Sequence, residues 1–177
     1  MYEKTLHIRQ IYKGRVVTLQ ELDVELENGV CSKREIIRHH GAVAVLAKLP
    51  DGPFIFVKQF RKPVEQERIE VVAGTLEKGE HPEDCARREL SEETGYEAVS
   101  MVHLGAVYPS PGYVDERIEV FYAALNNEPH AVRLDHDEHV QPQIFTHEKI
   151  IEMIRQGIIR DSKTLATWLL YEKKIEA

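Results

Sequence analysis

The segment GTLEKGEHPEDCARRELSEETGY, residues 74–96, restricts what this chain can fold into more than any other part of the sequence. Seven of its 23 residues are Glu or Asp, and Glu89, Glu92 and Glu93 fall within five consecutive positions. Like charges at i,i+4 destabilise a helix by about 0.2–0.5 kcal/mol per pair. Either the segment forms a solvated acidic surface, or a positive charge that the sequence does not supply offsets the repulsion.

A helix is predicted over residues 82–94. Pro82 suits the first helical position and is followed by two acids, and Gly95 suits the C-terminal cap. The three glutamates, at i, i+3 and i+4, then share one face, while Ala86 and Leu90 share another that can pack on a sheet. Carboxylates gathered on one face are typical of a divalent cation site, because Mg²⁺ prefers oxygen ligands and leaves room for substrate phosphates.

Composition narrows the class of protein. The chain has 177 residues, with 42% hydrophobic residues, 30% charged residues and a net charge of −7. We expect a globular protein whose main partner is not nucleic acid, since phosphate-backbone binding depends on Lys and Arg. No apolar run is long enough for a transmembrane helix, and no signal peptide is recognised. Cys31 and Cys85 fit no metal or redox spacing, which favours reduced thiols in the cytoplasm.

The remaining pattern consists mainly of short strands. The Asn28-Gly29 and Asp51-Gly52 pairs predict hairpin turns. Strands are predicted at residues 16–26, 30–38, 41–49, 54–60, 69–73, 99–104, 116–124 and 143–145, and further helices at 148–155 and 162–174. Asp161 is the predicted N-cap of the last helix. This order favours an α/β (α+β) fold with a mixed sheet.

The acidic segment at residues 74–96 resembles the sequence motif of the Nudix hydrolases, which is called the Nudix box. This motif is a glycine followed at fixed spacing by Glu, Arg-Glu-aliphatic, Glu-Glu and Gly. The matching residues are Gly74, Glu80, Arg88, Glu89, Leu90, Glu92, Glu93 and Gly95, with Tyr96 where an aliphatic residue is usual. The resemblance implies an α/β/α sandwich over residues 41–177. It also implies a small antiparallel sheet over residues 1–40, through which two copies dimerise.

In this family the box binds divalent metal, so the resemblance implies roles for its residues. The metal ligands would be Glu89, Glu92, Glu93 and the carbonyl of Ala73, with Mg²⁺ as the cofactor and Mn²⁺ as a possible substitute. Glu92, Glu93 and Arg88 are also candidate catalytic groups. Arg88 would orient the box together with Glu80. The substrate class is a nucleoside diphosphate linked to another moiety.

Two features outside the box resemble the ADP-ribose pyrophosphatase subfamily. The first is the Ser-Pro-Gly turn with a following acid, whose residues are Ser110, Pro111, Gly112 and Glu116; Pro111 stands fifteen residues after the end of the box. The second is the stretch VKQFRKPVEQERIEVVAG, residues 57–74, where Gln-Phe-Arg is followed by Glu70. By this resemblance Arg61 and Glu70 would contact substrate. Val72 stands where this subfamily has proline, which weakens the expected rigidity of the loop.

The acidic stretch RLDHDEHVQP, residues 133–142, resembles a loop that delivers a carboxylate to the attacking water. Glu138 is the first choice for the catalytic base, followed by Asp137 and Asp135. The predicted function is hydrolysis of ADP-ribose to AMP and ribose 5-phosphate. A Nudix hydrolase of another nucleotide sugar or of a dinucleoside polyphosphate is the alternative, and a non-catalytic ligand sensor is the third possibility.

Overall fold

The computed structural model describes residues 1–126, 128–131 and 139–176. Its backbone contacts divide the chain into two compact units. One unit contains Met1–Gly41 and Tyr108–Arg117, and the other contains Ala42–Val107 and Ile118–Ala177. The segment that carries the Ser-Pro-Gly turn therefore belongs to the unit formed by the N-terminal strands.

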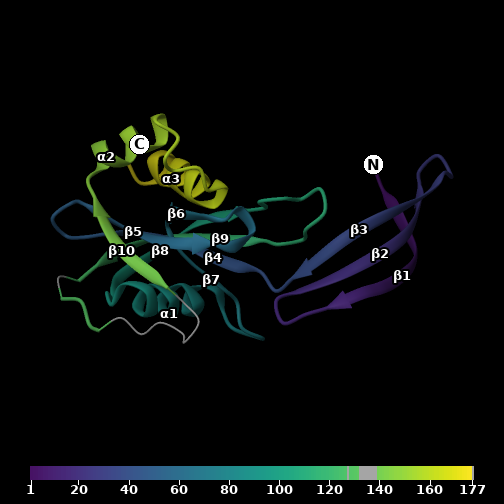
Figure 1. Cartoon of the computed structure of the whole chain (residues 1–177), viewed down its shortest axis with the longest axis horizontal. Coiled ribbons are helices and arrows are strands. Elements are labelled where there is room, and N and C mark those ends of the chain that lie inside the picture. The colour runs from purple at the N-terminus through teal and green to yellow at the C-terminus, as the bar shows by residue number, and fades with distance from the viewer. Residues whose placement is uncertain (127, 132–138, 177) are drawn as a thin grey trace. The chain divides into compact units, whose positions relative to one another are not determined.

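The first unit contains a three-stranded antiparallel sheet with the order β1-β2-β3 (Figure 1). Its strands are β1 (Glu3–Lys13), β2 (Val17–Leu26) and β3 (Cys31–His39). The turn between β2 and β3 is the predicted one: Gly29 has φ of +80° and donates to the Leu26 carbonyl at 2.9 Å. Strand β1 was not predicted, because all its residues are exposed and no burial pattern marks it.

The segment Tyr108–Arg117 attaches to β3 within this unit. Ile37 donates its N–H to the Tyr113 carbonyl at 2.8 Å and accepts from the Asp115 N–H at 3.1 Å. These two bonds flank a short parallel bridge between Ile37 and Val114. The strand expected from residue 116 begins instead at Ile118, because the preceding residues bond to β3.

The second unit is built on a mixed seven-stranded sheet. Five strands follow the order β10-β5-β4-β9-β8, with β6 paired to β5 and β7 paired to β4; the β4–β9 pair is parallel. The strands are β4 (Ala42–Lys48), β5 (Phe54–Arg61), β6 (Gln66–Glu70), β7 (Val72–Thr75), β8 (Ala98–Val107), β9 (Ile118–Leu125) and β10 (Val140–Phe145).

Helices cover both faces of this sheet. α1 (Pro82–Thr94) lies on one face, and α2 (His147–Arg155) and α3 (Ser162–Lys174) lie on the other (Figure 1). In the described part of the chain, no helix has both the length and the apolar character needed to cross a membrane.

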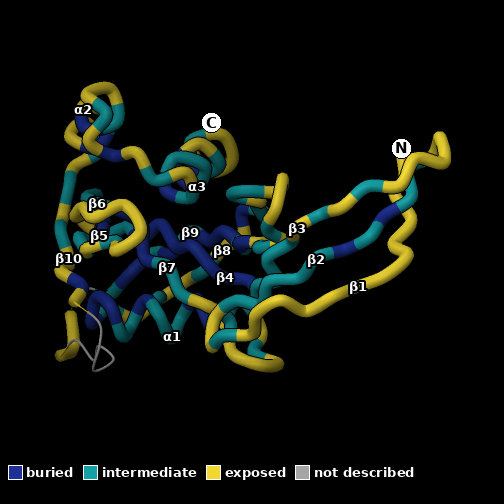
Figure 2. Tube along the Cα trace, turned by 45° about the vertical axis from the view of Figure 1, so that its right-hand side comes forward, coloured by how far each residue is buried: buried dark blue, intermediate teal, exposed yellow. Residues whose placement is uncertain are grey.

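The alternation of side chains along β4 explains the three layers. Ala44 and Leu46 belong to the core beneath α2 and α3, while Val43 and Val45 belong to the core beneath α1. A strand whose side chains are buried on both faces reads as a continuous apolar run, as residues 41–49 do. In Figure 2 this strand is the dark, fully buried centre of the unit. The predicted mixed α/β/α sandwich is confirmed.

Two strands differ from the expectation for a local reason. The single strand predicted at 69–73 is two strands: β6 pairs with β5, and β7 pairs with β4. The change of partner occurs at Val71, which lies between them. The strand predicted from residue 143 begins at Val140, because β10 is an edge strand, where Pro142 costs no ladder hydrogen bond.

Candidate functional site

Helix α1 separates apolar and acidic side chains as its spacing predicts. Ala86 and Leu90 are completely buried against the sheet. The three glutamates differ in depth: the side chains of Glu89 and Glu92 are 12% and 41% exposed, whereas Glu93 as a residue is only 3% exposed. The face therefore runs from a buried carboxylate to a solvent-accessible one.

Arg88 connects this face to the loop before the helix. Its Nε and Nη2 donate to the two oxygens of Glu80 at 2.9 and 3.1 Å, and its Nη1 donates to Glu89 at 2.8 Å and to Glu92 at 3.0 Å. The hydrogen bond from Arg88 lowers the pKa of Glu80 to about 2, and the same contact raises the pKa of Arg88. One guanidinium thus orients three carboxylates, those of Glu80, Glu89 and Glu92.

Strand β7 lies directly against the acidic face. Ala73 donates its N–H to the Glu93 carboxylate at 3.4 Å, and its backbone is fixed by pairing with Ala44 of β4. A Cβ added to Gly74 would lie 1.9 Å from the carboxyl carbon of Glu89. Only glycine leaves room for the glutamate at this point.

These residues suit a hard divalent cation. Glu89, Glu92 and Glu93 offer carboxylate oxygens on one side of α1, and oxygen is the kind of ligand that Mg²⁺ prefers. The Glu89 carboxyl occupies the space that a Cβ on Gly74 would fill, so the side chain of α1 packs directly against the backbone of β7. The assignment of these residues as metal ligands stays a prediction.

Glu70 forms a second charged group at the end of β6. The carboxylate is nearly inaccessible, with 1% exposure, and accepts from Arg61 Nε at 3.0 Å and Nη2 at 2.7 Å, as well as from Lys163. Burial raises the pKa of Glu70, but Arg61 and Lys163 together outweigh it, so the pKa lies below its usual range. A bidentate, buried pair of this kind fixes both side chains.

A pocket of about 370 Å³ opens beside this pair, and three arginines line it. Its lining consists of Arg61, Pro63, Val64, Arg68, Glu70, Arg160, Asp161 and Ser162. Its cations suit the phosphate groups of a nucleotide.

The Ser-Pro-Gly turn is well defined within the first unit. The Ser110 carbonyl accepts from the N–H groups of Tyr113 and Val114 at 3.2 and 3.0 Å. Glu116 lies 3.8 Å from the His39 ring nitrogen Nδ1. A pocket of about 430 Å³ lies here, lined by Tyr108, Pro111, Gly112 and Tyr113 together with Arg34, Arg38 and residues of β3.

The predicted base Glu138 falls outside the described residues, as do its alternatives Asp135 and Asp137. His136 also falls outside them. His139 is described and exposed.

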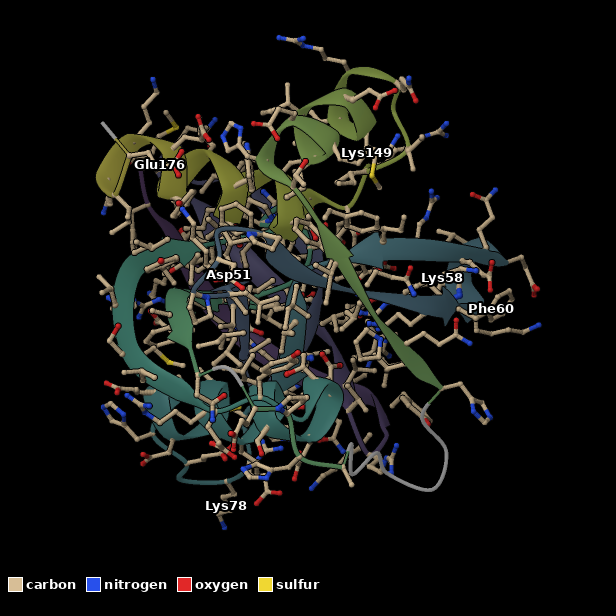
Figure 3. The ribbon with its side chains drawn as sticks, turned by 90° about the vertical axis from the view of Figure 1, so that its left-hand side faces the viewer. Asp51, Lys58, Phe60, Lys78, Lys149 and Glu176 are labelled. Atoms are coloured by element: carbon tan, nitrogen blue, oxygen red, sulfur yellow. The ribbon has the colours of Figure 1, made fainter. Side chains whose placement is uncertain are left out.

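A second group of possible metal ligands lies on the opposite side of the sheet from α1. His147, Glu172 and Glu176 bring one ligand atom each to within 4.8 Å of one another. Lys48 already pairs with Glu176 at 3.3 Å, and His147 with Glu172 at 2.7 Å, so an ion-pair network accounts for the group. Figure 3 shows Glu176 far from Lys78, which precedes α1.

Sequence reasoning missed Lys163 and Thr164. Lys163 contacts Glu70, and Thr164 Oγ1 accepts the N–H of Val71 at 3.0 Å. Both pairs are separated by 93 residues, so no local pattern could have revealed them. The one local signal was Asp161, correctly predicted as the cap of the helix that carries both residues.

The acidic helix, the glycine strand beside it and the three-layer sandwich together define the class of protein. A profile of the NUDIX domain matches residues 38–168, which is most of the chain. The chain therefore belongs to the Nudix family, as the box predicted, and it is a Nudix hydrolase. Nudix ADP-ribose pyrophosphatases depend on divalent metal ions.

Individual proteins of known function and structure are also similar to this chain. An ADP-ribose pyrophosphatase of Bacillus subtilis is 48% identical over 163 residues, which is 92% of this chain and 88% of the relative. A methanol dehydrogenase activator of Bacillus methanolicus is 48% identical over 92% of this chain and 89% of its own length. The crystal structure of an ADP compounds hydrolase superposes with a TM-score of 0.86 at 20% identity, covering 99% of this chain and 95% of that one, and supports the fold.

Proposed function

We propose that the protein hydrolyses the pyrophosphate bond of ADP-ribose with Mg²⁺ as its metal ion. Water is consumed, one P–O bond of the bridging oxygen breaks, and AMP and ribose 5-phosphate are released. The observation that carries the proposal is the complete set of box carboxylates on α1, set against the backbone of Ala73 and Gly74. The high identity to an ADP-ribose pyrophosphatase over nearly the whole chain supports the choice of substrate.

The box residues would hold the metal through Glu89, Glu92, Glu93 and the Ala73 carbonyl. A bound divalent ion at such a site supplies charge neutralisation for the pyrophosphate and acidifies water. Arg88 would orient Glu89 and Glu92 through its Nη1 hydrogen bonds.

Glu138 is proposed as the base that accepts the proton of the attacking water. A carboxylate in this role must come within hydrogen-bond reach of the water, and a loop can deliver it when substrate binds. Glu92 and Glu93 are the alternatives for this step.

Substrate binding is proposed for two sets of residues, each considered within its own unit. Arg61 and Glu70 line a pocket rich in arginine, which suits a phosphate or a ribose. Ser110, Pro111, Gly112 and Glu116 form the turn that would distinguish ADP-ribose from other nucleotide sugars. Tyr108 and Tyr113 beside this turn are 56% and 58% exposed, so their rings are available to stack on a base.

The assembly is proposed to be a homodimer formed through residues 1–40, because β1 is an exposed edge strand that carries apolar side chains. A cytoplasmic location agrees with the two free cysteines, Cys31 and Cys85. Cell fractionation tests the location, and recovery of the protein with secreted or membrane markers would reject it.

Product analysis of the purified protein tests the activity. ADP-ribose, GDP-mannose and diadenosine polyphosphates are each incubated with and without Mg²⁺, and the products are separated and quantified. We expect metal-dependent AMP and ribose 5-phosphate, mainly from ADP-ribose. Glu93→Gln should reduce the rate by roughly two to three orders of magnitude, whereas Asp84→Asn, an exposed acid on the same helix, should not.

Each other outcome has a definite meaning. Faster turnover of GDP-mannose would keep the metal site and reject the substrate assignment of the Ser-Pro-Gly turn. No turnover of any compound would favour the ligand sensor. In an active enzyme, Glu138→Gln should lower kcat more than it changes KM, and a normal kcat would pass the role of base to Glu92 or Glu93.

A further inference from the structure

Two residues in the first turn of α3 form hydrogen bonds with Glu70 and Val71, which lie directly before β7. Thr164 Oγ1 accepts the N–H of Val71 at 3.0 Å, and Lys163 Nζ donates to the carboxylate of Glu70. Val71 is completely buried, so its N–H depends on this partner rather than on water. The contact joins the C-terminal helix to the strand that carries Ala73.

The two side chains are themselves fixed by the cap of the helix. Asp161 Oδ2 accepts from the Thr164 backbone N–H at 2.9 Å and from its hydroxyl at 2.7 Å. The same oxygen lies 3.0 Å from Lys163 Nζ. Thr164 is 1% exposed, so its hydroxyl is shielded from competing water. One capping carboxylate therefore orients both groups that reach the strand.

The contact with Thr164 acts at Val71, which neither strand ladder pairs: pairing of β6 with β5 ends at Glu70, and pairing of β7 with β4 starts at Val72. Val72 is not a proline, so no ring limits the backbone at this point. The hydrogen bond from Ala73 N–H to Glu93 is long, at 3.4 Å. Pairing with β4 begins only at Val72, one residue after the contact with Thr164.

We infer that Lys163 and Thr164 are positioning residues for the metal site. By fixing Glu70 and Val71 they set the direction of the Ala73 carbonyl, two residues further along. This inference rests on the proposed function, in which that carbonyl is a metal ligand. Loss of a residue that orients a metal ligand typically weakens metal binding by about 10–100-fold.

A Thr164→Val variant tests the role of the hydroxyl, because valine keeps the shape of the side chain and leaves the Val71 N–H without its acceptor. Mn²⁺ serves as the probe, and its binding is followed by the electron paramagnetic resonance signal of the free ion. We expect the apparent Kd for Mn²⁺ to rise about tenfold. The Mg²⁺ concentration that gives half-maximal hydrolysis of ADP-ribose should rise similarly, with KM at saturating Mg²⁺ less affected.

Two matched controls separate positioning from general stability. Thr164→Ser keeps the hydroxyl and should restore the Mn²⁺ affinity. Thr167→Val makes the same change one turn along the same helix, where the buried hydroxyl has no hydrogen-bond partner among the described residues. It should leave the Mn²⁺ affinity unchanged, and thermal denaturation of all variants should report how far each is destabilised.

Lys163 provides a second test if Thr164→Val does not fold. Lys163→Met should weaken Mn²⁺ binding, and Lys163→Arg should restore it at least in part. Mn²⁺ affinity equal to wild type in folded Thr164→Val and Lys163→Met, with only the melting temperature lowered, would overturn the inference. A wild-type protein that neither binds Mn²⁺ nor hydrolyses ADP-ribose would instead reject the proposed function.

Discussion

At the scale of single residues, the pair between Glu80 and Arg88 shows how one carboxylate beside the acidic helix face is kept ionised. The Arg88 guanidinium lowers the pKa of Glu80 from 4.5 to about 2. Because the pKa of Glu80 is lower in the folded state than in the unfolded state, its pair with Arg88 stabilises the fold fully above pH 4.5. This stabilisation is lost as the pH falls from 4.5 towards 2, where the folded state also binds the proton.

Glu80→Gln should therefore destabilise the protein in a way that depends on pH. At pH 7 we expect a loss of about 1–2 kcal/mol, since a charged hydrogen-bonded pair is replaced by a neutral one. The difference from wild type should shrink below pH 4.5. Urea unfolding at pH 7, 5 and 3 measures it, and a difference that stays constant over this range would contradict the assigned cause.

Residue spacing predicted the helix face on which Glu93 lies, but not the burial of Glu93. The i, i+3 and i+4 positions placed three glutamates on one face, and the structure agrees. Spacing could not say which of them is buried. Glu93 is buried because it lies at the side of α1 that meets β7, next to the Ala73 N–H.

At the scale of elements, the contact between β7 and α1 depends on Gly74. A Cβ on this residue would displace the carboxyl end of Glu89, which is a flexible side chain and can move at low cost to stability. Gly74→Ala should therefore lower metal affinity by about 10–100-fold while the melting temperature changes little. Mn²⁺ titration and calorimetry of the same preparation measure both quantities.

Gly79→Ala is the matched control for this prediction. Gly79 has φ of +82° and open space around its missing Cβ, so alanine strains the backbone without meeting Glu89. It should lower the melting temperature and leave metal affinity close to wild type. The reverse pattern, with affinity lost in Gly79→Ala and kept in Gly74→Ala, would remove Gly74 from the site.

At the scale of the whole molecule, β1 is the surface through which we propose that two copies pair. Leu6, Ile8, Ile11 and Tyr12 of this strand are each about half exposed. An edge strand with apolar side chains is a ready surface for pairing with another chain. The proposed homodimer would cover it.

Substitution of both Leu6 and Ile8 by Glu should convert the dimer to a monomer. Light scattering after size exclusion should give twice the chain mass of 20.4 kDa for the wild type and the chain mass itself for the variant. Lys78→Glu, an exposed charge change before α1, should leave the mass unchanged. A monomeric wild type, or a variant that stays dimeric, would exclude β1 as the interface.

The sequence by itself determined the family, the limits of α1 and the sharing of one face by its glutamates. These features depend on residues close together in the chain, whose helical period and caps can be read directly. Most strands were predicted too, because buried runs and Asn-Gly or Asp-Gly turns are local signals. The exposed β1, which lacks such a pattern, was missed.

Only the tertiary structure decided which strands pair and which side chains support the site. The change of partner at Val71, the burial of Glu70 against Lys163 and the bond from Val71 to Thr164 join parts of the chain that are far apart in sequence. Such contacts depend on how the layers pack around the sheet. The sequence supplies the groups that make them, but their distances follow from the folded chain alone.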